Sequence, residues 1–260
     1  PSSCMPSTHE NKLPGFEPGW AFFLDVDGTL LELASHPDAV VLGPQLTETL
    51  EVLRIAINGA IALISGRSIE DLDNLFKPLR MPIAGQHGLE RRDYHGEIHH
   101  HKLPVGELDN AKKELSEFAD ENRGILIEDK GISLAVHYRQ APNIKSDLET
   151  LLKQLVSKLS GDFHLQQGKM IYEIKPSGKD KGIAIEEYMQ EQPFCGRIPV
   201  FIGDDSTDED GFRSVNKLQG YSIKVGAGDS EARWRLPDSD GVLKWLQAYR
   251  GFIEKHKQDK

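Results

Sequence analysis

Three short apolar segments, each followed at once by polar residues and glycine, restrict the folds open to this chain. They are residues 20–24, 60–64 and 198–202. Apolar runs of this length are typical of strands buried on both faces of a sheet. Between the first two runs, leucine and isoleucine recur at helical spacing from Leu46 to Ile57. Alternating strands and helices predict βαβ units and a parallel sheet.

The middle of the chain shows a different pattern. Apolar spacing predicts one helix near Leu108 and another near Leu148, accompanied by four strands. In the segment 131–138 apolar and polar residues alternate, as in a strand with one buried face. The βα pattern then returns. We therefore predict an α/β fold with a Rossmann-type parallel-sheet core, interrupted by an inserted α+β domain. The expected boundaries are 1–15 for a flexible tail, 16–104 and 176–260 for the core, and 105–175 for the insertion.

Composition excludes several classes of function. The formal net charge of −10 implies no broad basic surface, which argues against binding nucleic acid. No apolar stretch approaches the length that spans a membrane. The two cysteines, Cys4 and Cys195, predict neither a disulfide framework nor a metal site. We expect a cytoplasmic monomer that acts on a small molecule.

Carboxylates follow the predicted strands. Ligands of open α/β sheets bind at the carboxyl ends of the strands, so these side chains should cluster there. Their mutual repulsion would be relieved by a divalent cation, and ligation by oxygen alone suits Mg²⁺. The sequence thus predicts a magnesium site among Asp25, Asp27, Asp204, Asp205 and Asp208.

The first of these segments, Asp25-Val26-Asp27-Gly28-Thr29, also contains the groups that a phosphatase needs. Asp25 can attack phosphorus to form an aspartyl-phosphate. Asp27 can protonate the departing alkoxide and then activate water. Ser65 and Lys181 offer a hydroxyl and a cation to the phosphate oxygens, although the protein as a whole is acidic.

In this order, these features resemble the haloacid dehalogenase (HAD) superfamily of phosphatases. The resemblance implies an HAD-like core with Asp25 as nucleophile and Asp27 as general acid and base. Ser65 and Lys181 would bind phosphate. The implied Mg²⁺ ligands are Asp25, Asp204 and Asp208, with the backbone carbonyl of Asp27.

Further segments narrow the resemblance to the trehalose-6-phosphate phosphatase family, whose cap domain (C2 type, C2B) is inserted at the same place. They are Ser65-Gly66-Arg67, residues 85–90, His137-Tyr138-Arg139, Glu173-Ile174-Lys175-Pro176 and residues 203–209. The implied reaction is hydrolysis of trehalose 6-phosphate. Gln86 stands where we expect Asn in many relatives, and it keeps the amide. The residues predicted to bind substrate are Gly66, Arg67, Gln86, His87, Gly88, Glu128, Lys130, Arg139 and Glu173.

Alternatives remain open at this point. Glu128, Lys130 and Glu173 would bind the distal glucose or simply be solvated. His87 would contact substrate or hold its own loop, and the strand face with His137 and Arg139 would line the cleft or face water. The rival functions are a phosphatase for another sugar phosphate such as sucrose 6-phosphate, a mutase, and a non-catalytic sugar-phosphate sensor. A sensor has no need to retain both Asp25 and Asp27.

Overall fold

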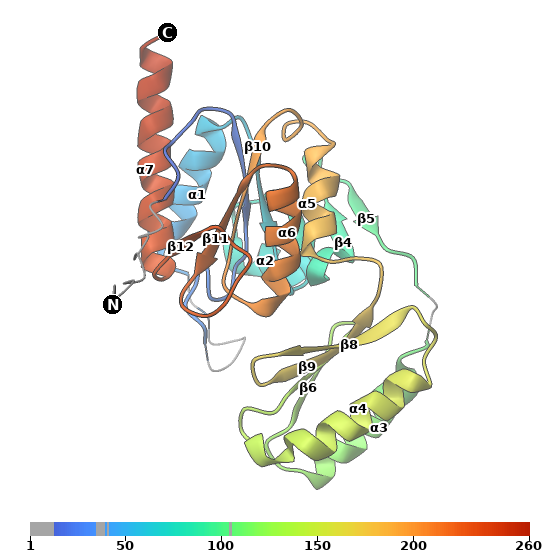
Figure 1. Cartoon of the computed structure of the whole chain (residues 1–260). Coiled ribbons are helices and arrows are strands. Elements are labelled where there is room, and N and C mark those ends of the chain that lie inside the picture. Colours follow the sequence, from blue (N-terminus) through green and yellow to red (C-terminus); the bar gives the residue numbers. More distant parts are fainter. Residues whose placement is uncertain (1–12, 35–39, 41, 104–105) are drawn as a thin grey trace, which may run out of the picture.

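The chain forms two units joined side by side, an α/β core and a smaller inserted unit (Figure 1). A computed structural model describes residues 13–34, 40, 42–103 and 106–260. Most of the expected tail, and Cys4 with it, therefore lies outside the described residues. Cys195 is a free, exposed thiol.

The core contains an eight-stranded sheet in the order β12-β11-β10-β1-β2-β3-β4-β5. Neighbouring strands from β12 to β3 are parallel, whereas β4 and β5 are joined antiparallel to its edge. The strands are β1 (Trp20–Leu24), β2 (Ile61–Ile64), β3 (Ile83–Gly85), β4 (Glu90–Arg92), β5 (Ile98–His100), β10 (Ile198–Gly203), β11 (Tyr221–Val225) and β12 (Trp234–Leu236).

Helices cover both faces of this sheet because its central strands are apolar on both sides. In β1, Trp20 and Phe22 pack toward one layer of helices, and Phe23 packs toward the other. The first layer consists of α1 (Pro44–Ala56), α2 (Ile69–Phe76) and α7 (Ser239–Gln258). The second consists of α5 (Lys181–Met189) and α6 (Glu209–Lys217). The predicted parallel α/β fold is confirmed.

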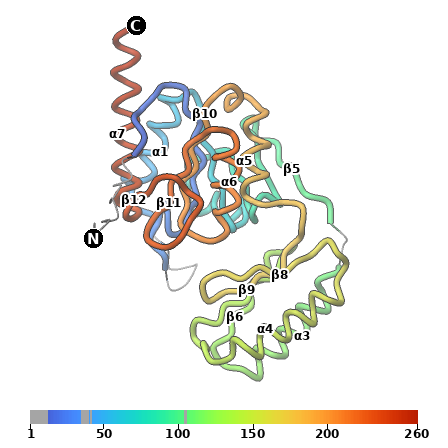
Figure 2. Tube along the Cα trace, viewed as in Figure 1, coloured from blue at the N-terminus to red at the C-terminus, as the bar shows by residue number. Residues whose placement is uncertain are grey.

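The inserted unit runs from α3 to β9 and has its own hydrophobic core. Its four-stranded antiparallel sheet has the order β6-β7-β9-β8, and α3 and α4 pack on one face. The other face is turned toward the α/β core, as the trace in Figure 2 shows. The elements are α3 (Asp109–Glu121), β6 (Leu126–Asp129), β7 (Leu134–His137), α4 (Lys145–Ser157), β8 (Phe163–Gly168) and β9 (Ile171–Pro176).

Apolar periodicity found the long elements and missed the short ones. The strands from β3 to β5 and β12 are three residues each, and β4 reads Glu-Arg-Arg. Such segments become strands because neighbouring strands offer hydrogen-bonding partners, and that information is not local.

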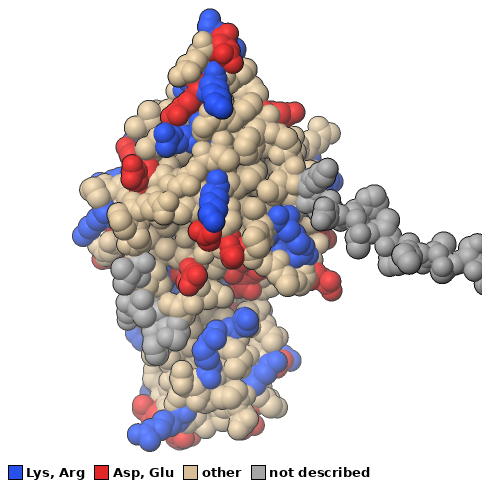
Figure 3. All heavy atoms as spheres, turned by 90° about the vertical axis from the view of Figure 1, so that its left-hand side faces the viewer, with Lys and Arg blue, Asp and Glu red and all other residues tan. Residues whose placement is uncertain are grey.

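The described residues contain no helix long and apolar enough to cross a membrane. On the face shown in Figure 3, acidic and basic side chains are interspersed over both units.

Because the inserted unit has a separate core, we expect a mutation in that core to lower the stability of the inserted unit and not that of the α/β core. Leu152 is fully buried there, and Leu152→Ala should cost about 2–5 kcal/mol. Hydrogen exchange should accelerate between α3 and β9, while β1 and β10 keep their protection. The neighbouring Lys153→Ala, at an exposed position, should leave exchange unchanged. Equal acceleration in both units would show that they unfold together.

Candidate active site

Strand register brings the polar residues that follow β1, β2 and β10 to one edge of the sheet. Leu24 of β1 is paired with Leu63 of β2 and with Ile202 of β10. The three strands therefore end level with one another, and Asp25, Ser65 and Asp204 follow. Helix α5 begins beside them, where the Asp180 side chain accepts a hydrogen bond from the Ile183 N–H at 2.8 Å.

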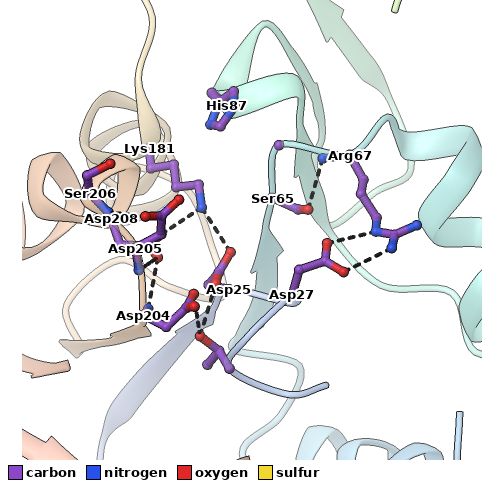
Figure 4. A network of polar contacts seen from close by, with 12 residues as sticks. Asp25, Asp27, Ser65, Arg67, His87, Lys181, Asp204, Asp205, Ser206 and Asp208 are labelled. Atoms are coloured by element: carbon purple, nitrogen blue, oxygen red, sulfur yellow. Dashed lines mark hydrogen bonds and ion pairs between the residues drawn. The ribbon is translucent and has the colours of Figure 1, made fainter. Parts of the chain in front are cut away.

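A buried lysine joins two carboxylates at the centre of this edge (Figure 4). Lys181 Nζ donates to Asp25 Oδ1 at 2.9 Å and to Asp208 Oδ1 at 2.6 Å. The second oxygen of Asp25 accepts from the Thr29 hydroxyl at 3.0 Å. All four side chains are buried. These bonds hold the first turn of α5 against β1 and the loop after β10.

Asp208 also organises the backbone of its own loop. Its Oδ2 accepts the N–H groups of Asp204 and Asp205 at 2.9 and 3.0 Å. Lys224, at the end of β11, donates to the carbonyl of Asp204. The Asp204 side chain itself is bonded weakly, with a 3.5 Å contact from the Thr29 hydroxyl. Asp204 is therefore the carboxylate of this group with most freedom to bind a ligand.

The carboxylates are not fully neutralised by Lys181. Burial raises the pKa of Asp25 to about 7, against the opposing charge of Lys181, and the charge of Asp204 adds to the rise. Burial likewise raises the pKa of Asp208 to about 7, with a further contribution from Asp25. Additional positive charge would lower the pKa of both groups and keep them ionised.

The arrangement fits a Mg²⁺ ion. Oxygen atoms of Asp25, Asp204 and Asp208 lie within 4.8 Å of one another. Gly28, with φ of 81°, leaves the space that this approach requires, because a Cβ there would lie 1.9 Å from Asp204 Oδ2. A donor set made of oxygen atoms alone, with room for water, is what Mg²⁺ prefers.

Asp27 lies on the opposite side of Asp25 from the lysine (Figure 4). Its two oxygens accept from Arg67 at 2.7 and 2.9 Å. The Arg67 N–H donates to the Ser65 hydroxyl oxygen at 3.0 Å. The loop after β2 thus holds Asp27 in place and sets Ser65 beside it.

His87 reaches the site from a strained loop. The backbone of Gln86, His87 and Gly88 has φ of 49°, 58° and 96°. The imidazole packs against Gly66, where a Cβ would come within 2.8 Å of Nε2. Burial lowers the pKa of His87 to about 4, so the ring is neutral near pH 7. Gln86 and Gly88 lie behind His87 and are not part of the cavity lining described below.

The inserted unit contributes Glu173, Lys130 and Ser133. Glu173 Oε2 lies 3.3 Å from His87 Nε2. Because an ionised carboxylate can only accept, Nε2 is the ring nitrogen that carries the hydrogen in this contact. The Ser133 hydroxyl donates to Glu173 Oε1 at 3.2 Å, and Lys130 Nζ lies 3.4 Å from the same oxygen. Lys130 also donates to the Gly66 carbonyl at 3.2 Å. Burial would raise the pKa of Glu173, but Lys130 and His87 outweigh it and hold that pKa well below its usual range.

These groups line one cavity of about 410 Å³ between the two units. Glu128 of β6 and His137 of β7 lie in the wall of the inserted unit and are joined at 2.9 Å, and Arg139 also lines the cavity. Of the residues predicted from sequence, the cavity wall includes Asp25, Asp27, Ser65, Gly66, Arg67, His87, Glu128, Lys130, Arg139, Glu173, Lys181 and Asp204. Asp208 lies directly beneath it.

Sequence reasoning missed three polar residues near the site. Thr29 stands inside the first motif, and its buried hydroxyl contacts Asp25. Ser133 shares a strand face with His137, so the alternation in that segment was an available signal. Lys224 is the one charged residue in the segment that forms β11, and its position in a buried strand could have been noticed.

Comparisons with known proteins find that this sequence is similar to trehalose-phosphatases. A family model described as trehalose-phosphatase matches residues 23–240. The trehalose-6-phosphate phosphatase of Escherichia coli K12 is 44% identical over 246 residues, which cover 95% of this chain and 92% of the relative. A probable trehalose-phosphate phosphatase of Sinorhizobium fredii is 43% identical over 225 residues, 86% of this chain and 84% of the relative.

Solved structures show the same fold at lower identity. The C-terminal domain of Candida albicans trehalose-6-phosphate phosphatase has a TM-score of 0.79 at 23% identity, covering 90% of this chain and 92% of that one. The C-terminal domain of a C. albicans trehalose synthase regulatory protein has a TM-score of 0.64 at 12% identity, covering 89% and 94%. A haloacid dehalogenase-like hydrolase of Bacteroides thetaiotaomicron gives 0.64 at 17%, covering 89% and 99%. Catalysis must be argued from site residues, because a fold does not fix a function.

The weak bonding of Asp204 leads to a prediction. In Asp204→Asn the metal-free protein should be more stable, by about 0.5–1 kcal/mol, because one of three repelling carboxylates is removed. The variant should also lose the stabilisation that Mg²⁺ gives the wild type. Calorimetric unfolding in EDTA and in Mg²⁺ measures both effects. Asp120→Asn is the control, because that carboxylate is exposed on α3 of the inserted unit and is outside the carboxylate group. A wild-type Mg²⁺ response in Asp204→Asn would contradict this ligand set.

Proposed function

The chain belongs to the trehalose-phosphatase family, and we propose that it hydrolyses trehalose 6-phosphate through a phosphoaspartate at Asp25. The products are trehalose and inorganic phosphate, so the chain is a phosphoric monoester hydrolase. The observation that supports this mechanism best is the buried contact of Asp25 with Lys181, beside the open cavity.

Two displacements at phosphorus complete the reaction. The Asp25 carboxylate forms a bond to phosphorus while the bond to the sugar oxygen breaks, and Asp27 gives that oxygen a proton. Asp27 then takes a proton from water, which attacks phosphorus and breaks the acyl-phosphate bond. Arg67 binds both oxygens of Asp27, and each oxygen keeps a second lone pair for proton transfer.

Cations and donors around Asp25 would bind the phosphate. Lys181 and the Ser65 hydroxyl lie on either side of Asp25 (Figure 4). Asp25, Asp204 and Asp208, with the backbone carbonyl of Asp27, would hold Mg²⁺. The bound ion would neutralise phosphate charge and orient the ester for in-line attack.

The inserted unit would act as a cap that recognises the sugar. Its Glu128, Lys130 and Arg139 line the cavity opposite Asp25. Charged groups of both signs suit a hydroxyl-rich ligand, which needs convergent donors and acceptors. Contacts of Lys130 and Glu173 with the core would bring the cap over the bound phosphate and exclude water.

The rival functions have less support. A non-catalytic sensor has no need of Asp25 and Asp27 in one organised site. A mutase would transfer phosphate within one sugar and release none. The cap type, the domain boundaries, the monomeric state, the cytoplasmic location and the absence of nucleic-acid or membrane partners stay predictions.

Asp25→Asn tests the nucleophile. The amide is a poor nucleophile, so kcat should fall at least about 10³-fold, equivalent to roughly 4 kcal/mol of transition-state stabilisation. Phosphate release with Mg²⁺ present measures the loss, and an unchanged thermal unfolding profile shows that the fold is intact. Asp120→Asn makes the same chemical change on α3 of the inserted unit, outside the cavity lining, and should keep most activity. If Asp25→Asn still releases phosphate at a substantial rate, Asp25 is not the nucleophile.

A substrate panel tests the sugar. The wild type should release phosphate from trehalose 6-phosphate far faster than from glucose 6-phosphate or sucrose 6-phosphate. In Glu128→Gln, KM for trehalose 6-phosphate should rise roughly tenfold or more, because one charged hydrogen-bond partner is lost. Hydrolysis of p-nitrophenyl phosphate, which has no sugar, should be nearly unchanged. If all three sugar phosphates react equally well in the wild type, the assigned substrate is wrong.

A further inference from the structure

A second cavity, of about 220 Å³, lies where β8 and β9 meet the start of α5. Residues of both units border it, along with the segment that returns the chain from the inserted unit to the core. The polar residues in its lining are His164, Gln166, Lys175, Ser177, Lys179, Asp180 and Asp210. Of these, only Gln166 also lines the main cavity.

Lys175 is a buried cation without a counter-ion. Its side chain is on the face of β9 that is turned to the core, and the residue is 3% exposed. Among the described residues it has no hydrogen-bond or ion-pair partner, and burial lowers its pKa. A buried ammonium without a hydrogen-bond acceptor is strongly unfavourable. The position therefore calls for a ligand that is not a protein group.

The other charges of this cavity are already engaged. Lys179 forms an ion pair with Glu187, and Asp210 forms one with Arg213. Asp180 accepts the Ile183 N–H at 2.8 Å as the cap of α5. Lys175 is thus the cation of this lining that forms no ion pair with a described residue. Asp180 keeps its negative charge, and it attracts Lys175 without a direct contact, as Glu173 and Asp210 do.

One acceptor is unsatisfied as well. The amide oxygen of Gln166 is buried without a hydrogen-bond partner in the described structure. The Ser177 hydroxyl lies 3.0 Å from His164 Nδ1 and offers a further polar contact at the wall. A fitting ligand offers an acceptor oxygen to Lys175 and an O–H to Gln166 or to a carboxylate of the lining.

We propose that this second cavity is a binding site for inorganic phosphate, distinct from the catalytic site. Phosphate at neutral pH is an anion that retains a hydroxyl, so it can accept from Lys175 and donate to Gln166 or to a carboxylate. Sulfate has the same shape and charge but no O–H. The cavity is small, which favours the free ion over a phosphate attached to a sugar. Phosphate bound here would contact both units and stabilise the relative position that they have in this structure.

Titration calorimetry of the Mg²⁺-loaded full chain tests the proposal. With inorganic phosphate the wild type should show two sites, one catalytic and one at Lys175. Lys175→Met should keep the catalytic site and weaken the second at least about tenfold, since a charged hydrogen bond is lost. Lys175→Arg keeps the charge and should retain two sites. Lys158→Met, an exposed change elsewhere in the inserted unit, is the control and should also retain two.

Further ligands separate the possible sources of the anion. Sulfate and glucose 6-phosphate should each bind the second site at least about tenfold more weakly than inorganic phosphate, for want of an O–H and of space respectively. One phosphate site in the wild type, or two in Lys175→Met, would overturn the proposal. Equal affinity for sulfate would overturn the role of Gln166, and equal affinity for glucose 6-phosphate would overturn the assignment to the free ion. The readout is binding, so it does not depend on which substrate the enzyme hydrolyses.

Discussion

The contact of Lys181 with Asp25 and Asp208 is the constraint on which the rest of the site depends. It joins β1, the start of α5 and the loop after β10 at a buried position, where an ammonium and a carboxylate each need the other. The same contact leaves negative charge in excess, since three carboxylates converge there. The contact stabilises the folded chain, and the remaining negative charge favours binding of a cation, which can in turn bind a phosphate.

The inserted unit is fixed to this centre by fewer and weaker bonds. Glu173 reaches His87 at 3.3 Å, and Lys130 reaches the Gly66 carbonyl at 3.2 Å. Both core partners lie beside Ser65, so the position of the inserted unit is linked to the loop that would bind phosphate. Long polar contacts of this kind can open and reform at little cost, as a cap that admits a disaccharide must do.

Lys181 and Lys175 are both buried, but they differ in their carboxylate partners. Lys181 has two carboxylate partners, and its pKa lies well above the usual range because Asp208 and Asp25 outweigh burial. Lys175 has none among the described residues, and burial lowers its pKa. Lys181 is held in place by its carboxylates at the catalytic site, where it would bind the substrate phosphate, whereas Lys175 has no carboxylate contact and is available to an anion from solution.

Local sequence was sufficient to predict the parallel core, because buried strands and amphipathic helices follow from periodicity. It was also sufficient to predict the group of carboxylates, because parallel strands end at one edge of the sheet. It also placed Asp25 and Asp27 in their motif. Tertiary structure decided what periodicity cannot encode: the short strands β3 to β5, the Arg67 clamp on Asp27, the contact of Glu173 with His87, and the missing partner of Lys175. Each depends on residues far apart in the chain, such as Lys181 and Asp25 with 156 positions between their numbers. Such pairs meet only when the chain packs into its tertiary structure, and their energies depend on the burial that packing creates.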